Sequence, residues 1–244
     1  MKVVAISQAR MSSTRLPGKV MMRVLGRTLL DWHISRVRRA KNVDQVIVAS
    51  TTNPADDALC AHAAELGAEV FRGPEDDVLA RYVGAADKYD ADVVVRVTSD
   101  CPLIDPAVID DTIVTFLSAK PRADYGCNRL PQTYPRGMDT EVFWAEALRE
   151  AYREAQAAQD REHVTLFLWR QPDRYRLVNA PARGDHSRLR WTVDTPEDYV
   201  LVRRLIEGLA PSHPNFTLDD CLAFIARYPE LEAINQHIEQ KKVL

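Results

Sequence analysis

The stretch that decides the fold is KVVAISQARMSSTRLPGK, residues 2–19. Its first part, Lys2–Ile6, is a short apolar run rich in β-branched residues, which predicts a buried strand. A polar loop follows directly, and Leu29–Arg39 then places its apolar residues at helical spacing. A strand, a polar loop and an amphipathic helix in this order are typical of the first unit of an α/β domain.

The same alternation of strands and helices continues to about Pro121. It predicts strands at Val43–Ala49, Ala68–Phe71 and Asp92–Val97 and helices at Asp56–Leu66, Val78–Tyr89 and Pro106–Leu117. The strands are nearly continuous apolar runs, as expected when helices cover both faces of a parallel sheet. We therefore predict an α/β fold, a Rossmann-like and mostly parallel sheet flanked by helices.

The pattern changes after Pro121. Ala123–Arg136 is rich in Pro, Asn and Tyr, which predicts a loop or an irregular strand. Beyond it we expect helices at Trp144–Ala158, Arg161–Arg170, Thr195–Ile206 and Leu218–Gln240 and short strands at Tyr175–Asn179 and Arg188–Val193. We interpret the chain as one domain, residues 1–244, with an inserted α+β region at about 122–187.

Composition excludes several classes of protein. The 244 residues hold 32 Lys plus Arg and 35 Asp plus Glu, so the net charge of -3 argues against an electrostatic nucleic-acid binder. Hydrophobic residues at 46% argue against disorder. The four cysteines lack CxxC spacing, so we expect ordinary buried thiols. The sequence suggests neither a signal peptide nor a membrane span, and we expect a cytoplasmic protein.

The charge is unevenly distributed along the chain. Residues 1–41 hold ten Lys or Arg and one acid, Asp31, a net charge of +9. Because this basic part is interleaved with a strand, a turn and a helix, it is folded rather than a tail. Its loop cations, Arg10, Arg15 and Lys19, follow a strand end, where ligands of α/β sheets bind. The guanidinium groups of arginine can bind phosphate oxygens in pairs. The same composition is also typical of an ordinary, solvent-exposed basic loop.

Two aspartates could complete a phosphate site. Asp100 follows the strand Asp92–Val97, where a carboxylate can hold a divalent cation against phosphates. A turn before Cys-Pro explains it equally well. Asp194 precedes Thr195–Asp198, which resembles a capping box with Pro at the first helical position, so Asp194 has no structural task of its own. Asp105, in contrast, directly precedes Pro106 and is explained as a helix cap.

Other catalytic arrangements find little support. His163 lies in the compact polar group Asp160–Thr165, which could contact a polar substrate or simply begin a helix. The remaining histidines lack metal-ligand spacing, and the Gly-x-Ser-x-Gly elbow of serine hydrolases is absent from the sequence.

Taken together, three segments resemble one enzyme family. The loop 8–19, SDCPLI at 99–104 and VDTPED at 193–198 are similar to the nucleotide loop and the two metal motifs of sugar-acid cytidylyltransferases, the CMP-Kdo and CMP-sialic acid synthetases. Further segments resemble the spore coat polysaccharide branch in particular: Arg72–Gly73, Asp77–Tyr82, Gly137–Phe143 and Arg161–Thr165. The resemblance spans Met1 to about Gly208 and implies the fold of nucleotide-diphospho-sugar transferases.

The resemblance implies roles for individual residues. The nucleotide would be bound by Gln8, Ala9, Arg10, Ser12, Ser13, Arg15, Lys19, Arg72 and Asp100, with Arg72 near the base or ribose. Mg²⁺ would be held by Asp100 and Asp194, which with Arg15 and Lys19 form the catalytic set. The acceptor would be bordered by Asn128, Asp139, Glu141, Arg161, Glu162 and His163.

The implied reaction is transfer of CMP from CTP to an acidic sugar, with release of pyrophosphate, in surface polysaccharide or glycoconjugate biosynthesis. The alternatives are a phosphonate acceptor, a nucleotide-sugar-dependent glycosyltransferase or a non-catalytic nucleotide-binding module. A glycosyltransferase is less favoured because its Asp-x-Asp motif is missing at Ser99–Pro102. The resemblance also implies a homodimer with contacts near Tyr125–Tyr175, and no nucleic-acid or membrane partner.

Overall fold

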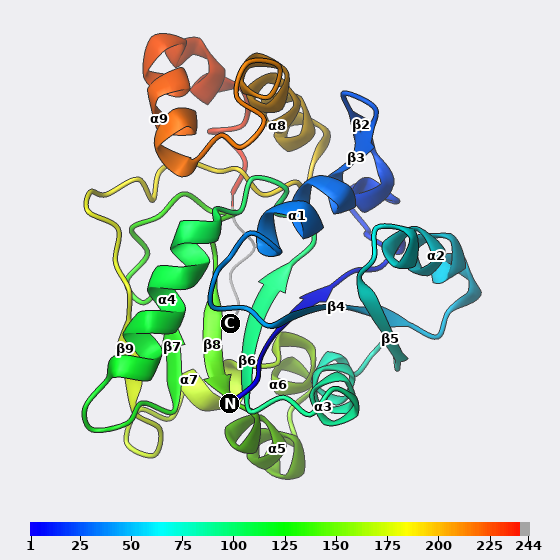
Figure 1. Cartoon of the computed structure of the whole chain (residues 1–244), viewed down its shortest axis with the longest axis vertical. Coiled ribbons are helices and arrows are strands. Elements are labelled where there is room, and N and C mark those ends of the chain that lie inside the picture. The colour runs from blue at the N-terminus through cyan, green and yellow to red at the C-terminus, as the bar shows by residue number, and fades with distance from the viewer. Residues whose placement is uncertain (240–244) are drawn as a thin grey trace.

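The computed structural model describes residues 1–239. Within this range seven strands form one sheet in the order β5-β4-β1-β6-β8-β7-β9 (Figure 1). The strands are β1 (Val3–Gln8), β4 (Gln45–Thr51), β5 (Glu69–Gly73), β6 (Val93–Thr98), β7 (Tyr125–Cys127), β8 (Glu141–Trp144) and β9 (Leu177–Asn179). The first four are parallel, and β8 pairs antiparallel with both β6 and β7. The expected α/β class with a mostly parallel sheet is confirmed.

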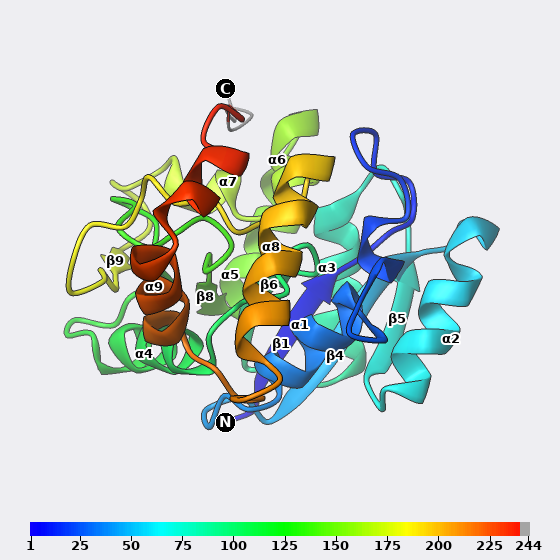
Figure 2. The same cartoon turned by 90° about the horizontal axis from the view of Figure 1, so that it is seen from above.

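Helices cover both faces of the sheet (Figure 2). Alternate residues of β1 point to opposite faces: Val4 and Ile6 pack towards α3 (Val78–Lys88) and α5 (Ala145–Glu154), and Val3 and Ala5 pack towards α1 (Leu29–Val37) and α4 (Pro106–Ser118). The remaining helices are α2 (Asp57–Glu65), α6 (Ala158–His163), α7 (Leu166–Trp169), α8 (Pro196–Leu209) and α9 (Leu218–Arg227). This double cover explains why the strands are apolar along their whole length.

Local sequence signals fix two helix starts close to the strand ends. The Asp105 side chain accepts a hydrogen bond from Ala107 N and Pro106 occupies the first turn of α4, which confirms the expected cap. Thr195 and Asp198 form the expected capping box at the start of α8. The four cysteines are buried and unpaired, also as expected.

Two expected elements were wrong. Arg188–Val193 forms no strand: Arg190 makes one isolated bridge to Arg136, and the Val193 amide donates to Asp100 O instead. Its alternating apolar side chains, Leu189, Trp191 and Val193, pack against α8 and α9 instead of belonging to a sheet ladder. The expected helix Leu218–Gln240 ends at Arg227 and continues as a 3₁₀ helix from Pro229 to Ile234, because proline interrupts a helix. Gln240 lies outside the described residues.

Other boundaries differ from expectation. The expected helix Arg161–Arg170 is divided into α6 and α7 at Val164, whose φ is 58°. Strand β8 was not expected, and neither was the small hairpin of β2 (Arg23–Val24) and β3 (Arg27–Thr28). The proposed inserted region supplies β7, β8 and β9 to the common sheet. Among residues 1–239 no helix has both the length and the apolar character that a membrane span needs.

Candidate active site

The carboxyl ends of β1 and β6 open into a polar cavity of about 270 Å³. Gln8 ends β1, Thr98 ends β6, and both line the cavity. The loop after β1 returns to the cavity through Gly18, whose φ of 68° suits a glycine, so that Lys19 begins a short 3₁₀ helix with its side chain directed inward. The basic loop and the β6 end therefore meet at one point, as the parallel topology requires.

Asp100 and Asp194 converge on one ammonium group. Lys19 Nζ donates to Asp100 Oδ2 and to Asp194 Oδ1, each at 2.8 Å. Burial alone would lower the pKa of Lys19, but the two carboxylates outweigh it and raise that pKa above its ordinary value. Burial opposes ionisation of Asp100, yet Lys19 lowers the pKa of Asp100 to about 2. Lys19 and Asp100 are therefore both charged at neutral pH.

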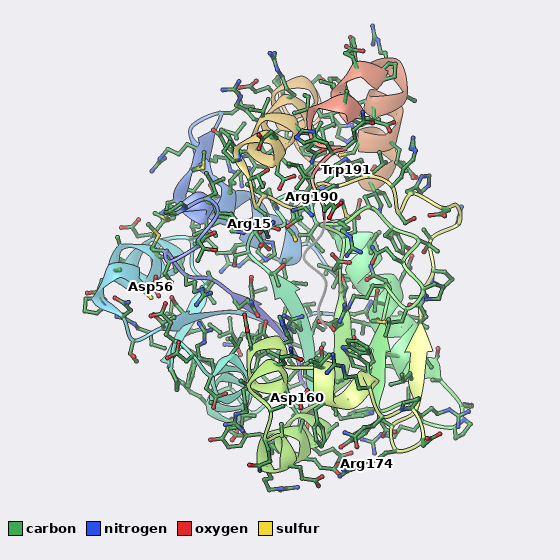
Figure 3. The ribbon with its side chains drawn as sticks, turned by 180° about the vertical axis from the view of Figure 1, so that it is seen from behind. Arg15, Asp56, Asp160, Arg174, Arg190 and Trp191 are labelled. Atoms are coloured by element: carbon green, nitrogen blue, oxygen red, sulfur yellow. The ribbon has the colours of Figure 1, made fainter. Side chains whose placement is uncertain are left out.

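Asp194 is also held by two arginines from different segments. Arg15 and Arg190 each donate to Asp194 Oδ2 at 2.9 Å. Figure 3 shows both side chains near the strand ends, with α6, marked by Asp160, on the other side of these ends. Arg190 is 6% exposed and also pairs with the buried Asp198, so it fixes Asp194 to the start of α8. Arg15 is much more exposed and can turn towards a ligand.

A buried hydrogen-bond chain supports the loop that carries Asp100. His33 of α1 contacts Cys101 O through Nδ1 at 2.9 Å and Ser7 Oγ through Nε2 at 2.8 Å, and Ser7 contacts Ser99 Oγ at 2.7 Å. Burial lowers the pKa of His33 to about 4, so its ring is neutral at pH 7. These hydrogen bonds hold Ser99 and Cys101, the residues on both sides of Asp100, in place.

The donor set fits a hard divalent cation. Mg²⁺ is usually bound by one or two carboxylates together with substrate phosphates, and Asp100 and Asp194 already face a common cation, the Lys19 ammonium. Within residues 1–239 there is no group of three or more His, Cys, Asp or Glu side chains placed to hold a metal by themselves. A metal here would thus depend on phosphate oxygens for the rest of its shell.

A second cavity of about 160 Å³ adjoins the first and shares Arg96, Thr98 and His163 with it. It is also lined by Arg129, Arg136, Asp139, Glu141 and Trp169. Glu141 is buried; it accepts hydrogen bonds from Tyr125 Oη at 2.5 Å, Thr165 Oγ1 at 2.7 Å and Arg129 at 2.9 Å, and it pairs with Arg96. Burial opposes ionisation, but Arg129 and Arg96 hold the pKa of Glu141 well below its usual range.

Four of the residues that resemblance assigned to binding face elsewhere. The Arg72 guanidinium donates to Thr51 O and Asn53 O and pairs with Asp57, outside both cavities. The Asn128 side chain donates to Met138 O and accepts from Thr140 N, so it stabilises the chain before β8. Arg161 is paired with Asp77, and Ser12 donates to Glu75 Oε1. Each of these side chains is occupied by contacts within the fold, and its binding role stays a prediction.

The other assigned residues lie at the two cavities. The first is lined by Gln8, Ala9, Arg10, Ser13, Arg15, Lys19, Asp100, Glu162, His163 and Asp194, and the second by Asp139, Glu141 and His163. Sequence reasoning missed Arg81, Arg96, Arg129 and Arg136. Only Arg96 left a clear signal, because it is the one charged residue in the apolar run 93–98.

Comparison with known proteins identifies the family of this chain. Residues 4–243 match the model of a protein family described as cytidylyltransferase. The chain belongs to the cytidylyltransferase family. This cytidylyltransferase is accordingly a nucleotidyltransferase enzyme, and the family expected from the three sequence motifs is confirmed.

Individual relatives of this cytidylyltransferase cover all or part of it. The spore coat polysaccharide biosynthesis protein SpsF of Bacillus subtilis is 34% identical over 236 residues, 93% of this chain and 95% of SpsF. A cytidylyltransferase structure from Leptospira borgpetersenii superposes with a TM-score of 0.91 at 32% identity, covering 99% of this chain and 100% of that one. The 3-deoxy-manno-octulosonate cytidylyltransferase of Geobacter metallireducens is 33% identical over 118 residues, 48% of this chain and 46% of its own.

Proposed function

We propose that this cytidylyltransferase transfers CMP from CTP to an acidic sugar, with Mg²⁺, and releases pyrophosphate in the biosynthesis of a surface polysaccharide or glycoconjugate. The observation that carries the proposal is the convergence of Asp100 and Asp194 on Lys19 in the cavity that Arg10 and Arg15 also line. This cavity adjoins a second one that is rich in arginine. The names of SpsF and of the 3-deoxy-manno-octulosonate cytidylyltransferase support this class of product.

In this reaction an acceptor hydroxyl oxygen forms a bond to the α-phosphorus of CTP. The bond from that phosphorus to the oxygen shared with the β-phosphate breaks, and pyrophosphate leaves with the electron pair. Arg15 and Lys19 offset the charge that develops on pyrophosphate. Asp100 and Asp194 would hold Mg²⁺, whose chemistry there would be to polarise the α-phosphate and to make the acceptor hydroxyl more acidic.

The second cavity is suited to the acceptor. Glu141 balances part of the charge of Arg96 and Arg129, whereas the Arg136 guanidinium has no ion-pair partner among residues 1–239. An acceptor carboxylate placed there would gain charge-assisted hydrogen bonds. His163 lines both cavities and is the side chain best situated to take the hydroxyl proton.

The test is pyrophosphate release from CTP with a panel of acceptors: nonulosonic and other acidic sugars, and phosphonates. The wild-type protein should release pyrophosphate with an acidic sugar, and D100N and D194N should each be slower by about 100-fold or more. D87N is the matched control, because Asp87 forms an exposed pair with Arg149 on another part of the molecule.

Four outcomes contradict the proposal or a part of it. Activity with a phosphonate alone would change the acceptor class. Consumption of a finished nucleotide sugar without use of CTP would indicate a glycosyltransferase, and nucleotide binding without turnover would indicate a binding module. Wild-type rates in D100N and D194N would remove the metal assignment.

The expected homodimer stays a prediction. The aromatic residues in the expected contact region, Tyr125–Tyr175, are largely accounted for within the fold. Tyr134 and Phe143 are buried, Trp144, Phe167 and Trp169 pack against the core, and only Tyr152 is substantially exposed.

A further inference from the structure

One charged side chain of the first cavity has no task in the chemistry above. Arg81 of α3 lines this cavity and is 2% exposed. Its Nε and Nη1 atoms are buried without a hydrogen-bond partner among residues 1–239. An arginine stays protonated in proteins, and burying such a charge unpaired is costly. A guanidinium in this position indicates that a ligand supplies the missing acceptors.

The fold keeps Arg81 in this unfavourable position. The helix that carries it begins at Asp77, whose side chain accepts from Ala80 N and is itself paired with Arg161. The Arg81 stem lies on Gly73 of β5, where an added Cβ would come within 2.7 Å of Arg81 Cγ. Glycine at 73 therefore makes room for the stem of Arg81, beside the cavity that Arg81 lines.

A second buried arginine shows the contrast. Arg36 is 1% exposed and its Nη1 also lacks a partner among residues 1–239, but its Nε donates to Ile104 O at 2.7 Å and its Nη2 to Phe216 O at 2.9 Å. Those bonds join α1 to two neighbouring segments, so Arg36 is explained by the fold. No such bond is found for the Arg81 guanidinium in the described part of the chain, and the fold does not explain it.

Position within the cavity decides which part of a ligand Arg81 meets. The phosphate and metal groups belong to the end formed by Lys19, Asp100 and Asp194. The second cavity, suited to the acceptor, is not lined by Arg81. The charged neighbours of Arg81 include Arg10, Asp56 and Glu75, on the β4 and β5 side of the site.

Apolar side chains stand beside Arg81 on this side of the cavity. Val78, one turn earlier on α3, and Ala9, which follows β1, both line the cavity. A flat heterocyclic base buries its faces against such side chains while its edge meets a polar group. The remaining end of the nucleotide, its base, therefore belongs here.

We propose that Arg81 recognises the base of the nucleotide and selects cytosine over uracil. A guanidinium presents two N–H donors side by side. Cytosine presents two adjacent acceptors, O2 and N3, whereas uracil carries a hydrogen on N3 and would turn a donor towards the guanidinium. The inference rests on the proposed use of CTP, and it assigns the base contact to Arg81 instead of Arg72.

The experiment measures binding of CTP and UTP to the full-length protein by calorimetry with Mg²⁺ present and no acceptor. Wild type should bind CTP about 10- to 100-fold more tightly than UTP, the discrimination typical of a bidentate base contact. R81Q should lose most of this ratio, and R81K, which keeps the charge but not the paired donors, should lose a large part of it. R149Q, a surface arginine variant, should keep the ratio.

A modified nucleotide gives a second measurement that needs no variant to fold. The triphosphate of 3-deazacytidine has a carbon in place of N3, so wild type should bind it about as weakly as UTP. Undiminished binding of this analogue, or an unchanged CTP to UTP ratio in folded R81Q, overturns the inference while leaving the proposed function intact. Wild type that binds neither triphosphate overturns the proposed function itself.

Discussion

Replacing Glu141 by glutamine should destabilise the protein severely. Glu141 is 2% exposed and is the common partner of Arg96, Arg129, Tyr125 and Thr165. Glutamine keeps the shape, but it removes the negative charge and turns an NH₂ group towards donors. Removing one member of a buried ion pair costs about 3–5 kcal/mol because the remaining charge is left uncompensated. For a chain of this length that is a fall of roughly 6–20 °C in Tm.

The destabilisation caused by E141Q should become smaller as pH falls. Because the folded-state pKa of Glu141 lies well below its ordinary value of 4.5, ionised Glu141 stabilises the fold above that value, and this contribution is lost as pH falls further. The gap between wild type and E141Q in free energy of unfolding should therefore be full at pH 7 and shrink from about pH 5 towards pH 3.

Urea unfolding followed by circular dichroism at several pH values measures this gap. The matched control is E146Q, because the Glu146–Arg122 pair is exposed and should contribute less than about 1 kcal/mol. An E141Q protein within 1 kcal/mol of wild type, or a gap that stays constant between pH 7 and pH 3, would refute the reasoning.

Two further perturbations test the site and its frame. K19M removes the ammonium that occupies the space between Asp100 and Asp194. Without nucleotide, this variant should bind Mg²⁺ more tightly than wild type, and it should lose pyrophosphate release. Calorimetric titration with MgCl₂ measures the affinity, and an unchanged value would contradict the shared-cation geometry. G137A should yield little folded protein, because Gly137 has φ 106° and an added Cβ would lie 2.7 Å from the Trp191 carbonyl carbon. A wild-type Tm for G137A would show that this contact relaxes freely.

The parallel half of the fold could be predicted from sequence because its signals are local. Apolar runs alternate with amphipathic helices there, and Asp105 and Thr195 mark helix starts by their side chains. Strand β8 could not be found in this way. It is four residues long, follows a turn-rich stretch, and pairs antiparallel with β6 by contacts far apart in sequence. The segment 188–193 shows the opposite error: its apolar residues alternate as in a strand, but Leu189, Trp191 and Val193 pack in the cluster with α8 and α9 without a sheet ladder.

The site was predictable where a motif and a strand end coincide. The resemblance assigned Asp100 and Asp194 to one metal site, and the structure brings both side chains to Lys19. Arg72 and Arg81 could not be told apart from sequence, because both are arginines near the β5–α3 connection. Which one enters the cavity depends on tertiary contacts: the Asn53 and Thr51 carbonyls hold Arg72, and Gly73 leaves room for Arg81.

Strand β6 lines both cavities, so it affects how ligands in the two cavities are aligned. Arg96 and Thr98 lie on the same strand, and both belong to the two adjoining cavities. Alternate residues of a strand are separated by roughly 6.5–7 Å, and β6 is fixed between β1 and β8 at the centre of the sheet. With nucleotide and acceptor placed in these cavities as proposed, we expect their spacing to follow the repeat of this rigid backbone rather than closure of a loop. Changes in acceptor preference should come from side chains around the second cavity, while the distance over which the group is transferred stays constant.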